Sequence, residues 1–192
     1  MESIYEDYNT RRALVVAAAA HEGQVRKYTG EGYITHPMAV AETLLEYGIE
    51  DPEMHIVALL HDVVEDTELT VEDVEKEFDW KVALLVNQLT KLELPGVPRV
   101  KRKQIEALRL ANAGAVVQTI KYADLLHNLK SIVVHDPKFA KVFLREARVL
   151  HDVMEDGDPD LRATLNDALE FYEDTVQTAE QVGLVKLFGH DY

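Results

Sequence analysis

The chain has 192 residues, a length that fits one domain and allows a sizeable core to be buried. Its formal net charge of −15 would repel nucleic-acid backbone and anionic membranes, so we expect neither as a partner. The absence of cysteine excludes disulfides, thiolate metal ligands and a cysteine nucleophile, and we expect a cytoplasmic protein. The longest apolar run, 13–20, is too short to span a membrane and follows an acidic segment, which argues against a signal peptide.

Helical spacing of apolar residues predominates along the chain, and proline, glycine and aspartate mark most of the expected helix ends. We expect helices over 11–21, 37–47, 51–66, a short segment opened by a Thr70–Asp73 capping box, 79–91, 100–111, 115–131, 136–157 and 161–181. The β-branched runs, such as Val133-Val134, are too short to predict strands. The expected fold is therefore an all-α bundle of about nine or ten helices, without strands.

The dipeptide His-Asp recurs along the chain, so only its surroundings can identify a site; the copies are His61-Asp62, His135-Asp136, His151-Asp152 and His190-Asp191. The first copy follows the apolar run 56–60 and is followed by Glu65 and Asp66. This spacing predicts four polar groups on one side of a helix, within a single turn. Their desolvation would be offset by a metal ion or by a water-filled cleft. The alternative is a solvated helix end.

Two further segments complete a pattern with the first His-Asp copy. His36 precedes Pro37 at an expected helix start, and Asp124 lies in a mostly apolar helix. Taken alone, His36 could cap a helix or pack in the core, and Asp124 could be a satisfied core carboxylate. Together with His61-Asp62 they form the ordered pattern H…HD…D. Imidazole and carboxylate donors without sulfur suit Mn²⁺, Fe²⁺, Zn²⁺ or similar ions.

The pattern and its surroundings resemble the HD-domain phosphohydrolases, and in particular the RelA/SpoT-type (p)ppGpp hydrolases, including the small stand-alone alarmone hydrolases. The stretches that carry this resemblance are HEGQVRK (21–27), GYITHP (32–37), ALLHDVVEDT (58–67), LTKL (89–92) and KYADLLHNL (121–129). The resemblance implies a single HD-type hydrolase domain over 1–192. Its motif-bearing core would cover about 13–131, and its C-terminal helices about 136–181.

The resemblance also implies an activity and a set of roles. The activity is metal-dependent removal of pyrophosphate from the 3′ position of ppGpp or pppGpp, which leaves GDP or GTP. One Mn²⁺, or another divalent ion, would be bound by the metal ligands His36, His61, Asp62 and Asp124. The catalytic carboxylates that activate water or pass a proton to the leaving oxygen would be Glu65 and Asp66. The residues contacting the guanosine nucleotide would be Arg26, Lys27 and Asn128.

The substrate and the assembly stay open at this level. The chain departs from the family around the nucleotide pocket, where Tyr28-Thr29 and Gly32 stand in place of a common serine and proline, and Leu125 in place of a common basic residue. One alternative is an HD phosphohydrolase for another nucleotide, such as NADPH or a dNTP; another is a catalytically silent nucleotide- or protein-binding module. An acidic helical bundle is also compatible with a homo-oligomer. There is no G-x-x-x-x-G-K-[ST] loop and no G-x-S-x-G elbow, which argues against an ATP-driven enzyme or a serine hydrolase.

Other conspicuous residues have weaker interpretations. The stretch 99–109 holds five of the 20 Lys and Arg residues, and it could either steer polyphosphate or form a solvated face. The segment 151–156 repeats the His-Asp-x-x-Glu-Asp spacing, but no upstream histidine or downstream aspartate completes it, so we expect an ordinary helix end. The remaining expectations are packing or ligand-supporting roles for His21 and His127, structural or exposed positions for His55, His135 and His190, and core positions for Phe78 and Trp80.

Overall fold

The computed structural model describes residues 4–181, and within that range the chain forms ten α-helices and one 3-10 helix without a strand. In chain order they are η1 (Ile4–Glu6), α1 (Tyr8–Ala20), α2 (Thr35–Glu46), α3 (Pro52–Leu60), α4 (Val63–Asp66), α5 (Val71–Glu77), α6 (Trp80–Leu89), α7 (Arg99–Ala111), α8 (Ala115–His135), α9 (Pro137–Val153) and α10 (Pro159–Gln181). The all-α prediction is confirmed. None of the described helices is long and apolar enough to cross a membrane.

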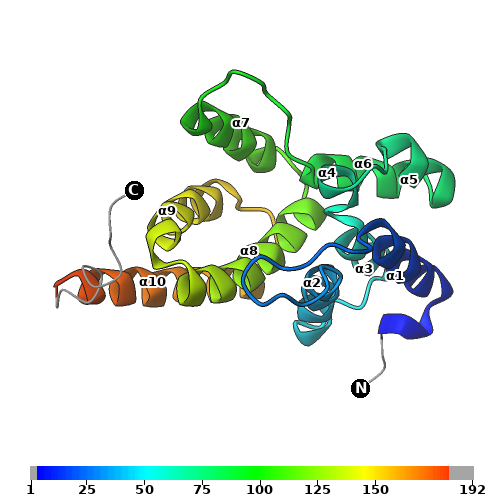
Figure 1. The fold of residues 1–192 in the computed structure, drawn as a ribbon. Coiled ribbons are helices and arrows are strands. Elements are labelled where there is room, and N and C mark those ends of the chain that lie inside the picture. The colour runs from blue at the N-terminus through cyan, green and yellow to red at the C-terminus, as the bar shows by residue number, and fades with distance from the viewer. Residues whose placement is uncertain (1–3, 182–192) are drawn as a thin grey trace.

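Helix α8 runs through the middle of the molecule and joins its two halves (Figure 1). On one side, α3 packs against α1 and α2, and α2 also contacts α8. On the other side, α9 and α10 pack against each other and against α8. Helix α7 stands apart at the end of a long loop, with its main contact to α9 (Figure 1). A residue in the middle of α8 can therefore meet groups from both halves.

Side-chain caps fix several helix starts. The predicted capping box is present: the Thr70 hydroxyl accepts from the Asp73 N–H, and the Asp73 carboxylate accepts from the Thr70 N–H. Asp51 and Asp136 each accept from a backbone N–H of the helix that they precede, and each is followed by a proline at the first helical position. These caps satisfy donors that a helix leaves unpaired in its first turn.

The prediction of one helix over 51–66 was wrong at its centre. Helix α3 ends at Leu60 and α4 begins at Val63. The two residues between them remain in the right-handed helical region, with φ −59° and ψ −29° at His61 and φ −101° and ψ −7° at Asp62. The His61 ring lies 2.6 Å from the Ala58 carbonyl, where it competes with the backbone hydrogen bond that a continuous helix would make. Apolar periodicity carries no information about such a side-chain contact.

The two aromatic residues around the start of α6, Phe78 and Trp80, differ in burial. The core position predicted for Trp80 was wrong: its side chain is 66% exposed because α6 starts at this residue, capped by Asp79. Phe78 is partly buried against the core, with the Arg12 guanidinium 5.3 Å from its ring centroid. His190 lies outside the described residues.

A buried polar contact fastens the segment between α9 and α10 to α8. The Gln118 side-chain oxygen accepts from the Gly157 N–H at 3.1 Å, and the Tyr122 hydroxyl donates to the Met154 carbonyl at 2.6 Å. A Cβ at Gly157 would lie 2.4 Å from the Tyr122 ring, so only glycine fits this close approach. The two C-terminal helices are thereby tied to the helix that carries Asp124.

Candidate metal centre and cleft

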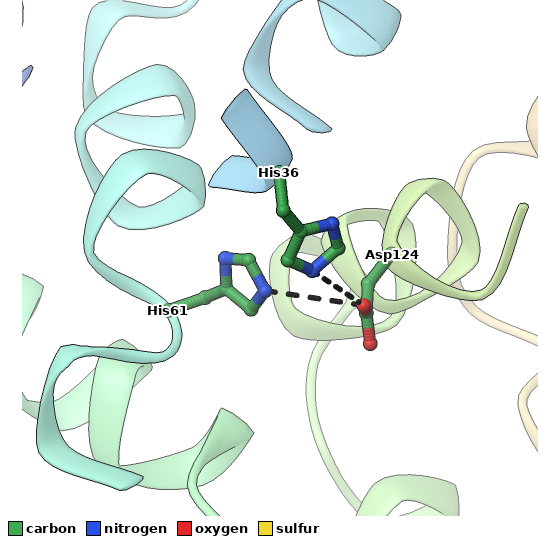
Figure 2. A group of neighbouring side chains, drawn as sticks. All are labelled: His36, His61 and Asp124. Atoms are coloured by element: carbon green, nitrogen blue, oxygen red, sulfur yellow. Dashed lines mark ion pairs between the residues drawn. The ribbon is translucent and has the colours of Figure 1, made fainter. Parts of the chain in front are cut away.

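Three buried side chains from separate elements meet beside α8 (Figure 2). His36 comes from the first turn of α2, His61 from the junction of α3 and α4, and Asp124 from the middle of α8. The Asp124 Oδ1 atom lies 3.2 Å from His36 Nε2 and 3.9 Å from His61 Nε2. One donor atom of each residue lies within 4.8 Å of the others, close enough to share a metal ion.

Asp62 lies against the same two histidines. Its Oδ2 atom is 3.2 Å from His61 Nε2 and 3.5 Å from His36 Nε2. The fold therefore brings together all four residues of the H…HD…D pattern. Two imidazoles and two carboxylates form a donor set that suits a first-row transition metal ion.

The outer nitrogen of each imidazole has a partner, which orients the inner nitrogen toward the carboxylates. The His61 Nδ1 atom lies 2.6 Å from the Ala58 carbonyl, and because a carbonyl can only accept, this nitrogen carries hydrogen. Within residues 4–181, His61 Nε2 is buried without a hydrogen bond. The His36 Nδ1 atom lies 2.8 Å from His127 Nδ1, so one ring donates to the other. Such outer contacts are typical of metal-binding histidines.

The electrostatics of the cluster favour a bound positive charge. Burial alone would lower the pKa of His61, but Asp62 and Asp124 outweigh it and raise this pKa to about 9. Burial would raise the pKa of Asp124, yet the Lys121 ammonium and the two histidines hold it well below its usual range. Burial lowers the pKa of His36 despite the nearby carboxylates. The carboxylates thus stay ionised and attract a proton or a cation.

Both oxygens of Asp124 are held by neighbours on its own helix. The Lys121 ammonium lies 2.7 Å from Oδ2, and the Asn128 amide nitrogen donates to Oδ1 at 2.6 Å. Sequence reasoning assigned no role to Lys121. Lys121 lies three residues before Asp124, and this spacing places the two side chains on the same face of α8. The spacing could therefore have identified Lys121 as a partner of Asp124.

The proposed catalytic carboxylates are held by residues from other segments. The Tyr33 hydroxyl lies 2.7 Å from Asp62 Oδ2 and 2.8 Å from Asp66 Oδ2, and so bridges the two carboxylates. Glu65 accepts from both the backbone N–H and the ammonium of Lys91. Tyr33 and Lys91 were not predicted to take part, because loop paths rather than helical spacing bring them there.

A cleft of about 820 Å³ opens beside Asp124, within the size range of small-molecule sites. Glu65, Asp66 and Asn128 also line it. Its basic lining residues are Lys91, Lys121, Arg99, Arg102, Lys103 and Arg109, four of which come from the basic stretch 99–109. That stretch is therefore a wall of the cleft.

The basic residues of α7 differ in their partners. Arg99 makes a paired contact with Glu146 of α9 at 2.7 and 2.8 Å. Lys103 lies 2.6 Å from Glu106. Arg109 donates to two backbone carbonyls at the end of α6. Within the described part of the chain, Arg102 forms no ion pair, so it presents an uncompensated charge to the cleft.

The three residues predicted to contact the nucleotide are not equally placed. Asn128 lines the cleft, and the Arg26 guanidinium donates to its side-chain oxygen at 2.9 Å. Lys27 does not belong to the lining: its side chain is 74% exposed and its ammonium lies 3.5 Å from Asp136. The fold brings Arg26 and Asn128 together but turns Lys27 away.

The remaining histidines have structural surroundings. His21 is buried and stacks on Tyr33, with ring centroids 4.6 Å apart. In the second His-Asp-x-x-Glu-Asp segment, His151 is buried and contacts Asp152 at 3.1 Å. Neither belongs to the group of donors found near Asp124 among the described residues. His55 is buried and His135 is exposed.

The sequence matches relatives that are much longer than this chain. Over 126 residues, 64% of the chain, it is 44% identical to the bifunctional (p)ppGpp synthase/hydrolase SpoT of Escherichia coli K12. Over 140 residues, 71% of the chain, it is 39% identical to the guanosine-3′,5′-bis(diphosphate) 3′-pyrophosphohydrolase of Vibrio cholerae. The matches span 18% and 20% of the length of these two relatives.

The fold has counterparts among solved structures, and the sequence matches a family model. A metazoan ortholog of SpoT that hydrolyzes ppGpp superposes with a TM-score of 0.78 at 29% identity, covering 85% of this chain and 95% of that one. A crystal structure of a Listeria monocytogenes EGD-e protein superposes with a TM-score of 0.62 at 27% identity, covering 76% of this chain and 98% of that one. The family model described as HD domain matches residues 13–153. The chain belongs to the HD domain family, and the resemblance to SpoT-type relatives predicted from its motifs is confirmed.

Proposed function

We propose that this chain is a metal-dependent hydrolase that removes the 3′-pyrophosphate of ppGpp or pppGpp and leaves GDP or GTP. The observation that carries the proposal is the cluster of His36, His61, Asp62 and Asp124 at the edge of a nucleotide-sized cleft. The SpoT-type relatives support the choice of a guanosine nucleotide.

The four clustered residues are proposed to hold one divalent ion, for which Mn²⁺ is our first candidate. The donor set fits such an ion because His61 Nε2 is buried, has no hydrogen-bond partner among the described residues, and faces two ionised carboxylates. A bound divalent ion lowers the pKa of coordinated water and stabilises negative charge on phosphoryl oxygens. His127 and the Ala58 carbonyl would keep the two imidazoles oriented for this task.

Glu65 and Asp66 are the proposed acid–base groups. Both line the cleft one turn beyond His61-Asp62, so either carboxylate can accept a proton from an attacking water and return it to the departing 3′ oxygen. Tyr33 limits the movement of Asp66, and the two donors of Lys91 limit the movement of Glu65. Holding these groups in place reduces the reorganisation needed for proton transfer.

The nucleotide is proposed to contact Arg26, Lys27 and Asn128. Arg26 offers a planar guanidinium that can stack on a base or pair with phosphate, and Asn128 offers an amide inside the cleft. Lys27 would have to exchange its exposed contact with Asp136 for an anionic group of the substrate. Exposed ion pairs of this kind are weak, so the exchange costs little.

The test is release of pyrophosphate from ppGpp by the purified protein with Mn²⁺, beside EDTA-treated protein and a panel of NADPH and dNTPs. Chelator-sensitive release from ppGpp is the expected result, with His61→Ala as the inactive control. Phosphate release only from another nucleotide would retain the metal centre but reject the alarmone. Metal binding without turnover of any nucleotide would favour a catalytically silent binding module.

A further inference from the structure

Arg26 contacts the surroundings of the metal centre from the loop between α1 and α2. Its guanidinium donates to the Asn128 side-chain oxygen at 2.9 Å, although 102 positions separate the two residues. Asn128 in turn donates from its amide nitrogen to Asp124 Oδ1 at 2.6 Å. That oxygen is the one that lies 3.2 Å from His36 Nε2. A chain of two hydrogen bonds therefore leads from Arg26 to a proposed metal ligand.

The first hydrogen bond of this chain determines the second. An asparagine amide presents an acceptor oxygen at one end and a donor nitrogen at the other, whereas a guanidinium can only donate. With Arg26 on the oxygen, the nitrogen of Asn128 must face Asp124. A flipped amide would turn its oxygen toward the carboxylate, where two acceptors repel. Arg26 thus determines which end of Asn128 meets the metal ligand.

The loop that carries Arg26 is itself held by backbone hydrogen bonds. The Arg26 N–H donates to the Glu31 carbonyl at 2.8 Å, and the Gly30 N–H donates to the Arg26 carbonyl at 3.0 Å. Gly30 has φ +73°, a left-handed conformation that glycine adopts without steric cost. The guanidinium also lies 5.6 Å from the Tyr33 ring centroid. Its position is therefore fixed from both the backbone and the side-chain end.

We propose that Arg26 is a positioning residue for the metal centre, which orients Asp124 through Asn128 before any nucleotide binds. This inference rests on the proposed function, because it takes Asp124 to be a metal ligand. It assigns Arg26 a task distinct from nucleotide contact, one that is measurable in protein without substrate. Partners of this kind typically change metal affinity by about 10–100-fold when they are removed.

The direction in which Mn²⁺ affinity changes when Arg26 is replaced distinguishes a positioning role from a purely electrostatic one. Arg26 is cationic, so deleting its charge should strengthen binding of a nearby cation if charge alone mattered. A positioning role predicts the opposite, a loss of affinity in Arg26→Ala. Lys27 is the matched control, because it is the neighbouring cation but contacts Asp136 and Tyr28 instead of Asn128.

The experiment titrates Mn²⁺ into the substrate-free protein and follows free Mn²⁺ by electron paramagnetic resonance. We expect Arg26→Ala and Asn128→Ala each to weaken Mn²⁺ binding roughly tenfold, the lower end of the usual range. The double variant should bind no more weakly than Asn128→Ala alone, since Arg26 acts through Asn128. Lys27→Ala should keep the wild-type affinity, and thermal unfolding of each variant establishes that it is folded.

Three outcomes would overturn the inference. These are unchanged or stronger Mn²⁺ binding in Arg26→Ala, additive losses in the double variant, or an equal loss in Lys27→Ala. Failure of the wild-type protein to bind Mn²⁺ or any other divalent ion is a different result, because it would refute the proposed metal centre on which this inference depends.

Discussion

His61 and Glu65 lie four positions apart, yet their surroundings suit them to different tasks. The His61 ring is buried between the α3 carbonyl of Ala58 and the carboxylates of Asp62 and Asp124. Glu65 faces the cleft, and Lys91 holds it through its backbone N–H and its ammonium. A ligand and a proton-transfer group should respond differently to substitution, which makes the pair informative.

We predict that His61→Ala abolishes turnover and lowers the metal content of the purified protein, since it removes a donor atom. Glu65→Gln keeps the shape of the side chain but removes its basicity, so turnover should fall by about 10²–10⁴-fold with metal content retained. Metal analysis by mass spectrometry and pyrophosphate release measure the two quantities. An equal loss of metal in both variants would show that Glu65 is misassigned as an acid–base group.

Some residues of the site can be identified from sequence motifs, whereas others reach the site only through the folded path of a loop. His36, His61-Asp62 and Asp124 stand in separate motifs whose order identifies them without a structure. Tyr33 cannot be found this way, because its contacts with Asp62 and Asp66 cross a separation of 29 and 33 positions through an irregular loop. Only the folded path of that loop brings the phenol to the carboxylates.

At the scale of elements, α7 is the least embedded helix around the cleft. It stands apart in Figure 1, and only Ala107 and Leu110 are buried among its residues. The Arg99–Glu146 pair anchors its first turn to α9, while Arg102 faces the cleft without an ion pair among the described residues. Such an arrangement leaves one cation available to a phosphate group remote from the metal centre.

We predict that Arg102→Gln raises the KM for ppGpp about fivefold, equivalent to roughly 1 kcal/mol, with little change in kcat. The difference should shrink at high salt, because the contact is solvent-accessible. Lys101→Gln is the matched control, since Lys101 is exposed on the same helix but absent from the cleft lining. An equal rise in KM for both variants would indicate general charge attraction rather than a contact at Arg102.

Helix ends were predictable wherever local chemistry sets them. The Thr70 cap and the Asp-Pro starts of α3 and α9 depend on residues adjacent in sequence, and all three were placed within a residue of their observed positions. The break between α3 and α4 was missed, since a ring-to-carbonyl contact within one turn leaves the apolar pattern unchanged. The exposure of Trp80 was likewise missed, because residue type alone does not say whether the first side chain of a helix faces the core or the solvent.

For the molecule as a whole, the buried side chain of His55 makes the free energy of unfolding depend on pH. It lies in α3 and is 2% exposed. Burial lowers its pKa below the ordinary value of 6.5. The unfolded chain therefore takes up a proton at a higher pH than the folded chain does, and the folded state loses stability as pH falls below about 6.5.

We predict that His55→Leu flattens the decline in unfolding free energy between about pH 7.5 and 5.5. One histidine contributes a slope of up to about 1.4 kcal/mol per pH unit in the window between its folded and unfolded pKa values. Urea denaturation at several pH values gives the slope for each protein. A wild-type slope in His55→Leu would contradict the prediction.

The four proposed donors to the metal ion come from positions 36, 61, 62 and 124, and this spacing has a consequence for the lifetime of the protein. An unfolded chain would have to close long loops to gather them, so an ion at the proposed centre binds the native chain almost exclusively. By mass action, free ion at a hundredfold excess over its Kd would add about 2.7 kcal/mol to native stability. Loss of the metal ion would then lower the stability of the chain, and so increase its proteolysis, as well as remove its activity. The abundance of the protein would therefore follow the supply of the ion.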